Sequence, residues 1–554
     1  MGRQSTASGL YSIAQGNVAQ ASNTGAIALG DSAFASGVQS VAIGSSGGAS
    51  ALYEAATQTL ASGSQAVAIG PNSKATGASS IVVGYSATAS GVEDIYTGKS
   101  AGAGGTSTNV ANIGIGSAAG QSLTGSYNIA LGYQSGQTVS GLANTATGFQ
   151  SGQTVSGSYN IADGYTTGRV VSGNANSAFG YGAGQTVSGF GNNSTGWDSG
   201  RNVTGNGNNA SGWDSGRQVL GNGNSSFGYG AGRSITGNGN TATGRDSGVS
   251  VSGDGNNASG WDSGTSVTGS GNSAFGYAAG RSITGGGNTS VGWNSGRNIN
   301  GNYNNASGYG AGQSISGSYN NANGVNAGMN VTGNSNNASG YQAGQSVTGD
   351  FNSAVGYEAG KVVSGNNNNA SGLRAGQSVT GAYNNAAGYN AGQSVLGNYN
   401  DAYGYKAGIS ATGQRNIAIG SSAGVTVSGS NNIAVGLNAG QNVAVSNTIS
   451  IGTSSTANAT QAIAIGNNAQ ATGVQSISIG TGNVVSGNNS GAFGDPSIIL
   501  GANSFSVGNN NSVGATQTDV FALGNNITVT ANNSVGLGSG AAMTTALTSS
   551  SGGT

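Results

Sequence analysis

Aromatic side chains recur along this 554-residue chain at a spacing that could form a binding surface. They occupy 15 of 21 equivalent positions in the central part of the chain, 16 residues apart, and all four tryptophans are among them. Rings in such a row could stack against sugars or other flat apolar partners. They could equally stack on one another and stiffen the fold, and so many equivalent positions favour this second interpretation. The candidate contact residues are Tyr133, Tyr181, Trp197, Trp213, Tyr229, Trp261, Tyr277, Trp293 and Tyr309.

Arginines accompany the aromatic residues near the middle of the chain. The motif Trp-Asp-Ser-Gly-Arg begins at Trp197 and again at Trp213, and it includes Arg201 and Arg217, with Arg233 next in the same position. A guanidinium group in this setting could bind a carbohydrate or a phosphate. We favour surface pairing with the neighbouring aspartates, because arginines stacked in a row repel each other and nearby carboxylates offset that repulsion.

The composition argues against several kinds of catalytic and metal site. The chain has no Cys and no His, so it lacks disulfides, thiolate ligands and imidazole bases. Its 15 acidic residues are scattered, with Glu93 and Asp94 as the only adjacent pair. Glycoside cleavage by a depolymerase would need two carboxylates flanking the scissile bond. We therefore expect no enzymatic activity, no metal and no cofactor.

Charge and hydropathy narrow the class of protein further. Fourteen basic residues balance the acidic ones to a net charge of −1, which is unlike the basic footprint of a nucleic-acid-binding protein. No apolar run reaches the length of about 18 residues that a membrane-spanning helix needs. The 109 glycines come with 2 prolines and no three-residue period, which excludes collagen.

A 16-residue repeat organises the centre of the chain. One glycine, here called the anchor glycine, recurs without interruption from Gly116 to Gly436 over 21 repeats, and an asparagine precedes it by four residues each time. Both flanks carry a 14-residue version, as at Gly16, Gly30 and Gly44. Helical and leucine-rich repeats are longer than this. Units of 14–16 residues are typical of single turns of a narrow parallel β-solenoid, whose corners suit glycine.

The expected fold is all-β: an elongated parallel β-solenoid of about 35 coils, each of 14–16 residues. We predict three segments: 14-residue coils with one insertion near residues 53–55 in residues 1–98, a central shaft in 99–446, and 14-residue coils with a short polar tail in 447–554. At about 4.8 Å per coil, the rod would be about 170 Å long.

The columns of the repeat predict what lies inside each coil. Two residues before the anchor glycine the side chain is small, as in Ala130, and seven residues after it the side chain is apolar, as in Val139. Only Ala411 reduces the bulk of that second column. Small residues facing branched ones suit a cramped interior. The invariant asparagines are expected to form an internal ladder of side-chain hydrogen bonds, beginning with Asn112, Asn128, Asn144, Asn160, Asn176, Asn192 and Asn208.

Large apolar residues flank the interior alanine in the outer coils, as in Val41 and Ile43 or Ile463 and Ile465. Strand alternation turns them away from the interior, where an exposed stripe would promote aggregation. Packing around a symmetry axis would cover the stripe, so we expect a homotrimer. The same positions are polar in the central repeats, which predicts a looser or hydrated axis there.

The flanking units resemble a known adhesin repeat. Residues 25–37 (Gly-Ala-Ile-Ala-Leu-Gly-Asp-Ser-Ala-Phe-Ala-Ser-Gly), 462–473 and 533–538 are similar to the YadA-like head repeat of trimeric autotransporter adhesins. The resemblance implies a left-handed parallel β-roll, three chains around an axis, and adhesion to surfaces. The repeat pattern by itself is also compatible with right-handed coils. The central units resemble repeats of phage tail fibres.

The function we expect is attachment to a host surface. The start of the chain lacks the apolar segment of a secretory signal, which favours a phage tail fibre or comparable virion appendage over an exported adhesin. Its partners would be two further copies, other virion or appendage proteins, and a glycan or protein of the host surface. We expect neither nucleic-acid binding nor membrane insertion, and a location in the virion or outside the cell.

Three alternatives remain from the sequence. They are a bacterial surface protein related to trimeric adhesins, a subunit that polymerises end to end into an extracellular filament, and an ice-binding solenoid. The last is disfavoured because the column eight residues after the anchor glycine mixes Ser156, Leu220 and Asn300 instead of repeating threonine.

Overall fold

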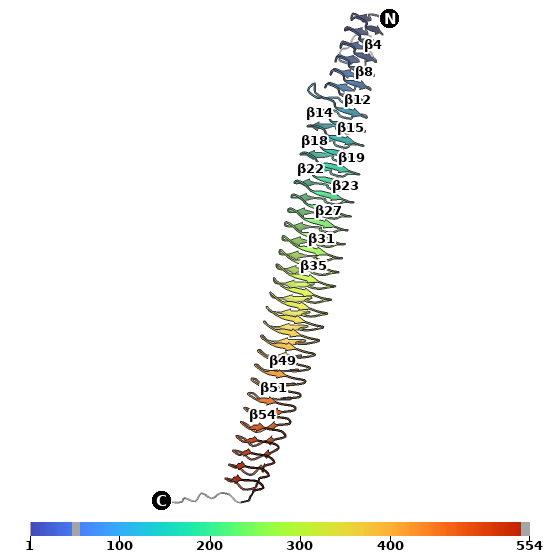
Figure 1. Cartoon of the computed structure of the whole chain (residues 1–554). Helices are drawn as coiled ribbons and strands as arrows, with labels where there is room; N and C mark the ends of the chain where they lie inside the picture. The colour runs from blue at the N-terminus through green and yellow to red at the C-terminus, as the bar shows by residue number, and fades with distance from the viewer. Residues whose placement is uncertain (1, 47–55, 545–554) are drawn as a thin grey trace, which may run out of the picture. The chain divides into compact units, whose positions relative to one another are not determined.

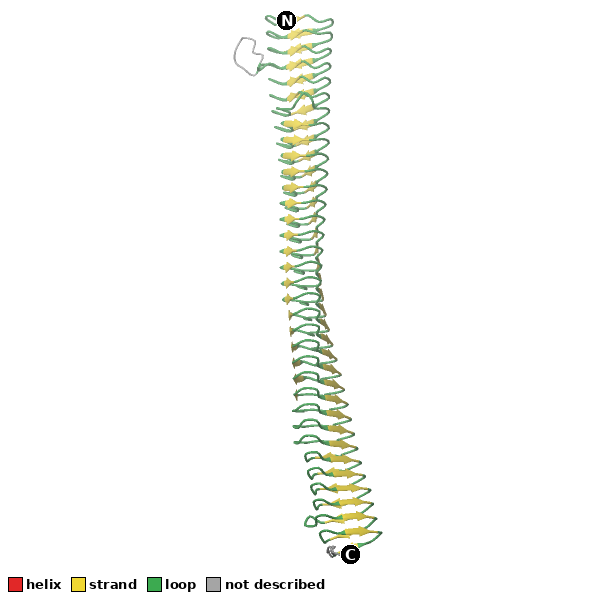
Figure 2. Ribbon diagram, turned by 90° about the vertical axis from the view of Figure 1, so that its left-hand side faces the viewer, coloured by secondary structure: helices red, strands yellow, loops and turns green. Residues whose placement is uncertain are grey.

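A computed structural model describes residues 2–46 and 56–544 of the chain. In these residues it consists of strands and turns without helices, and it confirms the prediction of an all-β parallel solenoid, here of about 33 turns (Figures 1 and 2). Across the same residues no helix could span a membrane. The insertion expected near residues 53–55 lies outside the described residues. The chain divides into unit 1, Met1–Ser282, and unit 2, Ile283–Thr554.

Unit 1 has two sheet-forming walls, and successive coils add strands in parallel (Figure 1). One long sheet runs from β2 (Ile13–Gln15) to β33 (Ser273–Phe275). The strands of the opposite wall run from β1 (Thr6–Ala7) to β11 (Thr88–Ala89) and from β14 (Ser122–Thr124) to β32 (Val267–Thr268).

The register between coils of unit 1 follows the repeat. Paired residues are 14 apart in the first coils, as in Ile27 with Val41, and 16 apart later, as in Ile129 with Thr145. At the join between the two repeat lengths, Ile113 pairs with the residue 18 positions before it.

Unit 2 has the same construction. Its long sheet runs from β35 (Thr289–Val291) to β64 (Val535–Leu537), and the register returns from 16 to 14 residues at Ile449, which pairs with Ile433 and Ile463. The strands of the opposite wall run from β34 (Ile283–Thr284) to β48 (Val395–Leu396) and from β53 (Thr456–Ala457) to β65 (Ala542–Met543).

Glycine closes the corner of each coil because the backbone of the next coil is too near for a side chain. Gly148, for example, has φ +117°, and a Cβ added to it would overlap the carbonyl oxygen of Gly164 in the next coil. Glycine adopts such dihedral angles without a steric penalty. The 16-residue spacing of the anchor glycine therefore reflects direct stacking of one corner on the next.

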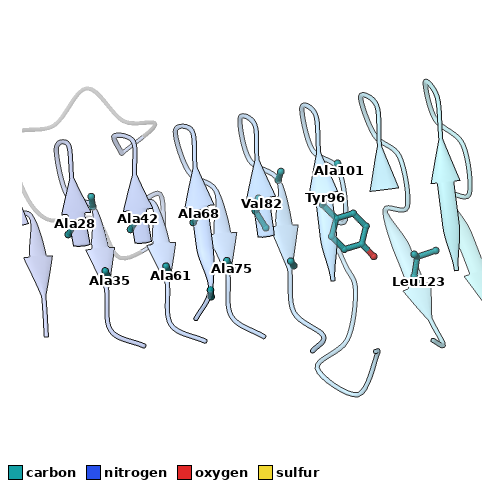
Figure 3. Close-up of a cluster of buried hydrophobic side chains, with 14 of the residues drawn as sticks. Ala28, Ala35, Ala42, Ala61, Ala68, Ala75, Val82, Tyr96, Ala101 and Leu123 are labelled. Carbon is teal, nitrogen blue, oxygen red and sulfur yellow. The ribbon is translucent and has the colours of Figure 1, made fainter. Parts of the chain in front are cut away.

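The interior is narrow and lined by small side chains. Strand β4 (Ile27–Leu29) buries only its central residue, Ala28, and the facing strand β5 (Phe34–Ala35) buries Ala35 (Figure 3). In the longer coils valine replaces the second alanine, as in Val155, which lies opposite the column of Ala146. Strand alternation thus sends every second residue inward, and the residues beside it point to the outside.

Tyr96 interrupts the column of small residues where the coil length changes. The ring lies among the buried side chains of the neighbouring coils (Figure 3). Tyr96 is 1 % exposed, and burial raises its pKa far above the usual value, with the charge of Asp94 acting in the same direction. Glycines make room for the ring: a Cβ at Gly102, Gly114 or Gly120 would overlap it. Gly114 itself stands where other coils carry alanine, so the tyrosine and the glycine compensate each other.

The substitution Gly114→Ala should destabilise unit 1 by about 1–3 kcal/mol, because the new methyl group has no space beside Tyr96. Chemical denaturation followed by circular dichroism measures this change. The double variant Tyr96→Ala, Gly114→Ala restores alanine at both positions and should recover most of the loss. A single variant as stable as the wild type, or a double variant no better than the single one, would contradict this account of the join.

Candidate functional site

The asparagines that precede the anchor glycine form a buried column, and unit 1 shows the pattern clearly. Asn192 Oδ1 accepts hydrogen bonds from the backbone N–H and from Nδ2 of Asn208, both at 2.9 Å. Nδ2 of Asn208 also donates to the carbonyl of Gly221 at 2.9 Å, and its Oδ1 accepts the same two bonds from Asn224. The amide of Asn208 therefore uses both of its donors and both lone pairs of its oxygen. Asn112, Asn128, Asn144, Asn160, Asn176, Asn192 and Asn208 all lie in this column.

The residue before the first asparagine in unit 1 and the residue after the last asparagine in unit 2 are not asparagines, and their side chains have the hydrogen-bonding groups that these end positions need. In unit 1 the first rung is Asp94, whose Oδ1 accepts the N–H and Nδ2 of Asn112 at 2.8 and 3.2 Å, and whose Oδ2 accepts the Gly91 N–H. A first rung needs acceptors only, which suits a carboxylate. Burial raises the pKa of Asp94, although these hydrogen bonds oppose the shift. In unit 2 the last rung is Thr448, whose hydroxyl donates to Asn432 Oδ1 at 2.7 Å.

The aromatic residues that follow the anchor glycine, here called the ring column, stack on one another. The ring centroids of Trp197 and Trp213 lie 4.9 Å apart with an interplanar angle of 4°, and those of Tyr133 and Phe149 lie 5.2 Å apart. Within such a stack the ring faces are covered and mainly the edges meet solvent. Of the candidate contact residues, Tyr133, Tyr181, Trp197, Trp213, Tyr229, Trp261 and Tyr277 lie in the ring column of unit 1, and Trp293 and Tyr309 in that of unit 2.

An arginine replaces a ring at one position of this column. The guanidinium of Arg245 lies 4.4 Å from the ring centroid of Trp261 and 5.4 Å from that of Tyr229, so it continues the stack as a cation–π contact. The faces on which a sugar could stack are thus largely occupied by other parts of unit 1.

The arginines beside the ring column are mostly engaged with aspartates. Arg217 approaches Asp214 at 3.4 Å, and Arg233 approaches both Asp214 at 3.4 Å and Asp246 at 3.0 Å. Arg201 forms no ion pair within the described residues. These side chains are partly exposed, so each ion pair contributes little to stability. The pairing nevertheless neutralises the arginine charge that an anionic ligand would need.

One ion-pair cluster in unit 2 is better enclosed. The Glu358 carboxylate accepts hydrogen bonds from Lys361 Nζ at 3.0 Å and from Arg374 Nε at 2.9 Å. The bond from Lys361 and then that from Arg374 hold the pKa of Glu358 below its usual range. The arrangement links two neighbouring coils and leaves neither oxygen free for catalysis.

A second set of aromatic residues, here called the outer tyrosine column, is not among the residues predicted from the sequence. Its members lie five residues before the anchor glycine, in the turn that precedes the strand of the long sheet, and their φ angles are positive. The sequence does space these aromatic residues by multiples of 16. A run of coils has glycine at the same position, however, and this interrupts the pattern. The members are Tyr127, Tyr159, Tyr303, Tyr319, Phe351, Tyr383 and Tyr399.

Apolar rows cover the outer face of the long sheet in both flanks. In unit 1, strand β10 (Ile81–Val83) buries Val82 and leaves Ile81 and Val83 exposed by 38 % and 36 %. In unit 2, β54 (Ile463–Ile465) and the next strand, β56 (Ile477–Ile479), each carry two half-buried isoleucines on the outer face. Paired strands place these residues directly above one another.

Comparison with protein families matches the flanks. The YadA head domain repeat matches residues 21–46, 61–87, 75–93, 446–469 and 471–495, which overlap two of the stretches predicted to resemble adhesin heads and confirm that resemblance. The chain is an adhesin-like fibrous protein. Repeats of this kind are typical of cell-surface or extracellular proteins. No curated protein matches the chain. The resemblance of the central repeats to phage tail fibres, and of residues 533–538 to adhesin heads, stays a prediction.

The substitution Asn208→Ala should destabilise the coils around it by about 3 kcal/mol, because the Gly221 carbonyl loses its donor and the buried Asn224 loses the acceptor of its backbone N–H and one acceptor of Nδ2. Chemical denaturation, together with hydrogen exchange of the coils on either side, measures the effect. Asn206→Ala is the matched control: Asn206 is exposed, and its side chain accepts one bond, from the Phe190 N–H, which water can replace. Equal losses in the two variants would contradict a structural role for the buried column.

Proposed function

We propose that this protein is a homotrimeric surface-attachment fibre without enzymatic activity. The observation that carries the proposal is the set of apolar rows on the outer face of the flanks. Ile81 and Val83 in unit 1 and Ile451 in unit 2 are each more than a third exposed in the single chain. A continuous exposed stripe of β-branched residues on an open sheet face is a liability unless another chain covers it. Three copies around one axis would bury both rows.

The polar face of the central repeats supports a different contact there. Asn305, Asn321 and Asn337 occupy the outward positions that are apolar in the flanks, and their side chains bond to one another at 3.0 and 2.8 Å. These amides satisfy part of their hydrogen-bonding capacity within one chain and favour water over an apolar neighbour. The fibre would therefore be held together mainly at its two flanks, with a hydrated centre.

The attachment role is supported by the match of the flanks to adhesin head repeats. Between the two settings considered, the match favours a protein of the cell surface or extracellular space. A virion tail fibre stays a prediction that rests on the central repeats. The partner surface would be recognised by residues other than the apolar rows, because the trimer would cover those rows.

The purified full-length chain should have a molar mass of about three times 52.9 kDa in light scattering after size exclusion. Replacing Ile463, Ile465, Ile477 and Ile479 by asparagine, the residue common at these positions in the central coils, should shift the mass toward the monomer. Val484→Asn, on the outer face of the opposite wall, is the control and should leave the mass unchanged.

Function is tested in the same preparation by coating beads with the protein and counting their adhesion to cells. We expect coated beads to adhere and beads coated with the isoleucine variant to adhere less, because a trimer presents three copies of any contact. A monomeric wild type, indefinite filaments, or beads that do not adhere would overturn the proposal.

A further inference from the structure

Tyr127 and Tyr159 stand at backbone positions that favour glycine. Both have φ 61°, and their side chains are 60 % and 62 % exposed. Left-handed dihedral angles cost a bulky residue about 1–2 kcal/mol. Other coils of unit 1 avoid this cost with glycine at the same position, at Gly191, Gly207, Gly223, Gly239, Gly255 and Gly271. The fold therefore has no need of a side chain there.

The backbone N–H groups of Tyr127 and Tyr159 donate to the carbonyls of Val110 and Leu142 at 2.9 and 2.8 Å, but glycine makes the same bond in other coils, as Gly191 does, so these bonds do not require a side chain. Among the described residues neither ring stacks on another ring, and neither hydroxyl forms a hydrogen bond. The contrast lies in unit 2, where Tyr303 and Tyr319 of the same column stack with centroids 5.2 Å apart. Strained side chains that persist without local compensation point to a role outside the fold.

The surroundings of Tyr127 and Tyr159 are uncharged, and the polar groups beside them, the hydroxyls of Ser126 and Ser158, accept hydrogen bonds from the backbone. The two tyrosines belong to coils separated by a single coil, so they are about 10 Å apart along the stack. Leu142, 45 % exposed, is on the intervening coil, beside Ala143, which shares the column of the tyrosines. The sequence contains no charged residue between Lys99 and Asp163. An anionic or cationic partner would find no counter-charge at this place.

We propose that Tyr127, Leu142 and Tyr159 form a binding site for a neutral polysaccharide. The C–H face of a sugar ring can pack on a tyrosine ring or on leucine, while the sugar hydroxyls stay hydrated or bond to the tyrosine hydroxyls. Three exposed side chains are too few for a stable protein interface, which buries about 800 Å² on each partner. A linear sugar chain lying along the column fits the spacing of the rings. This proposal rests on the attachment function and names its ligand class.

The test uses the full-length protein and a panel of immobilised polysaccharides: dextran, mannan and laminarin as neutral probes, alginate and heparin as acidic ones. We expect the wild type to bind at least one neutral probe, and Tyr127→Gly with Tyr159→Gly to weaken that binding at least tenfold. The same variant should unfold at the same or a higher denaturant concentration than the wild type, because glycine relieves the strain.

The matched control is Tyr133→Ala with Tyr165→Ala, two rings of the ring column with the same spacing in the same unit, and it should bind like the wild type. The proposal is overturned if only acidic probes bind, if no probe binds, if the glycine variant binds like the wild type, or if it unfolds more easily. Should coated beads still adhere to cells in any of those cases, this site is wrong and the attachment function stands.

Discussion

A buried column of asparagine amides links the coils of the central repeats to one another and closes the turn of each coil. The interior is too thin for a large apolar core, since alanine and valine supply most of its buried side chains. The amide of Asn208 joins three successive coils through bonds to Asn192 and from Asn224, and also ties down the turn of its own coil at Gly221. Removing such a partner leaves buried polar groups unpaired, so each coil depends on its neighbours.

Direct stacking has a consequence for the outer surface. Because coils repeat in register, residues of one kind form columns whether or not they bind anything. The ring column and the arginines beside it are candidate contact residues by their sequence spacing. In the structure, neighbouring rings cover one another's faces, as Trp197 and Trp213 do, and arginines pair with aspartates, as Arg233 does with Asp246. Among the described residues, the apolar rows of the flanks and the isolated members of the outer tyrosine column remain exposed without such contacts.

Much of the fold could be predicted because the period sets the register. The spacing of Asn112 and its equivalents, the inward alanines and the outward isoleucines all follow from one repeat and strand alternation. Features that occur once could not be predicted from the repeat. Tyr96 fits only because glycines in its own coil and in the next coil leave room for the ring, and this combination does not recur at the repeat spacing. Whether rings stack on each other or stay free also depends on side-chain orientation. The handedness and the trimer stay predictions, because a single chain's pattern is compatible with more than one assembly.

Electron cryo-microscopy of the purified full-length protein, at a resolution that shows side chains, tests the central claim most directly. We expect a line of stacked asparagine side chains inside the 16-residue coils of each unit, beginning after Asp94 in unit 1 and ending at Thr448 in unit 2. Asparagine side chains directed to solvent, or coils that are not spaced by this repeat, would contradict it.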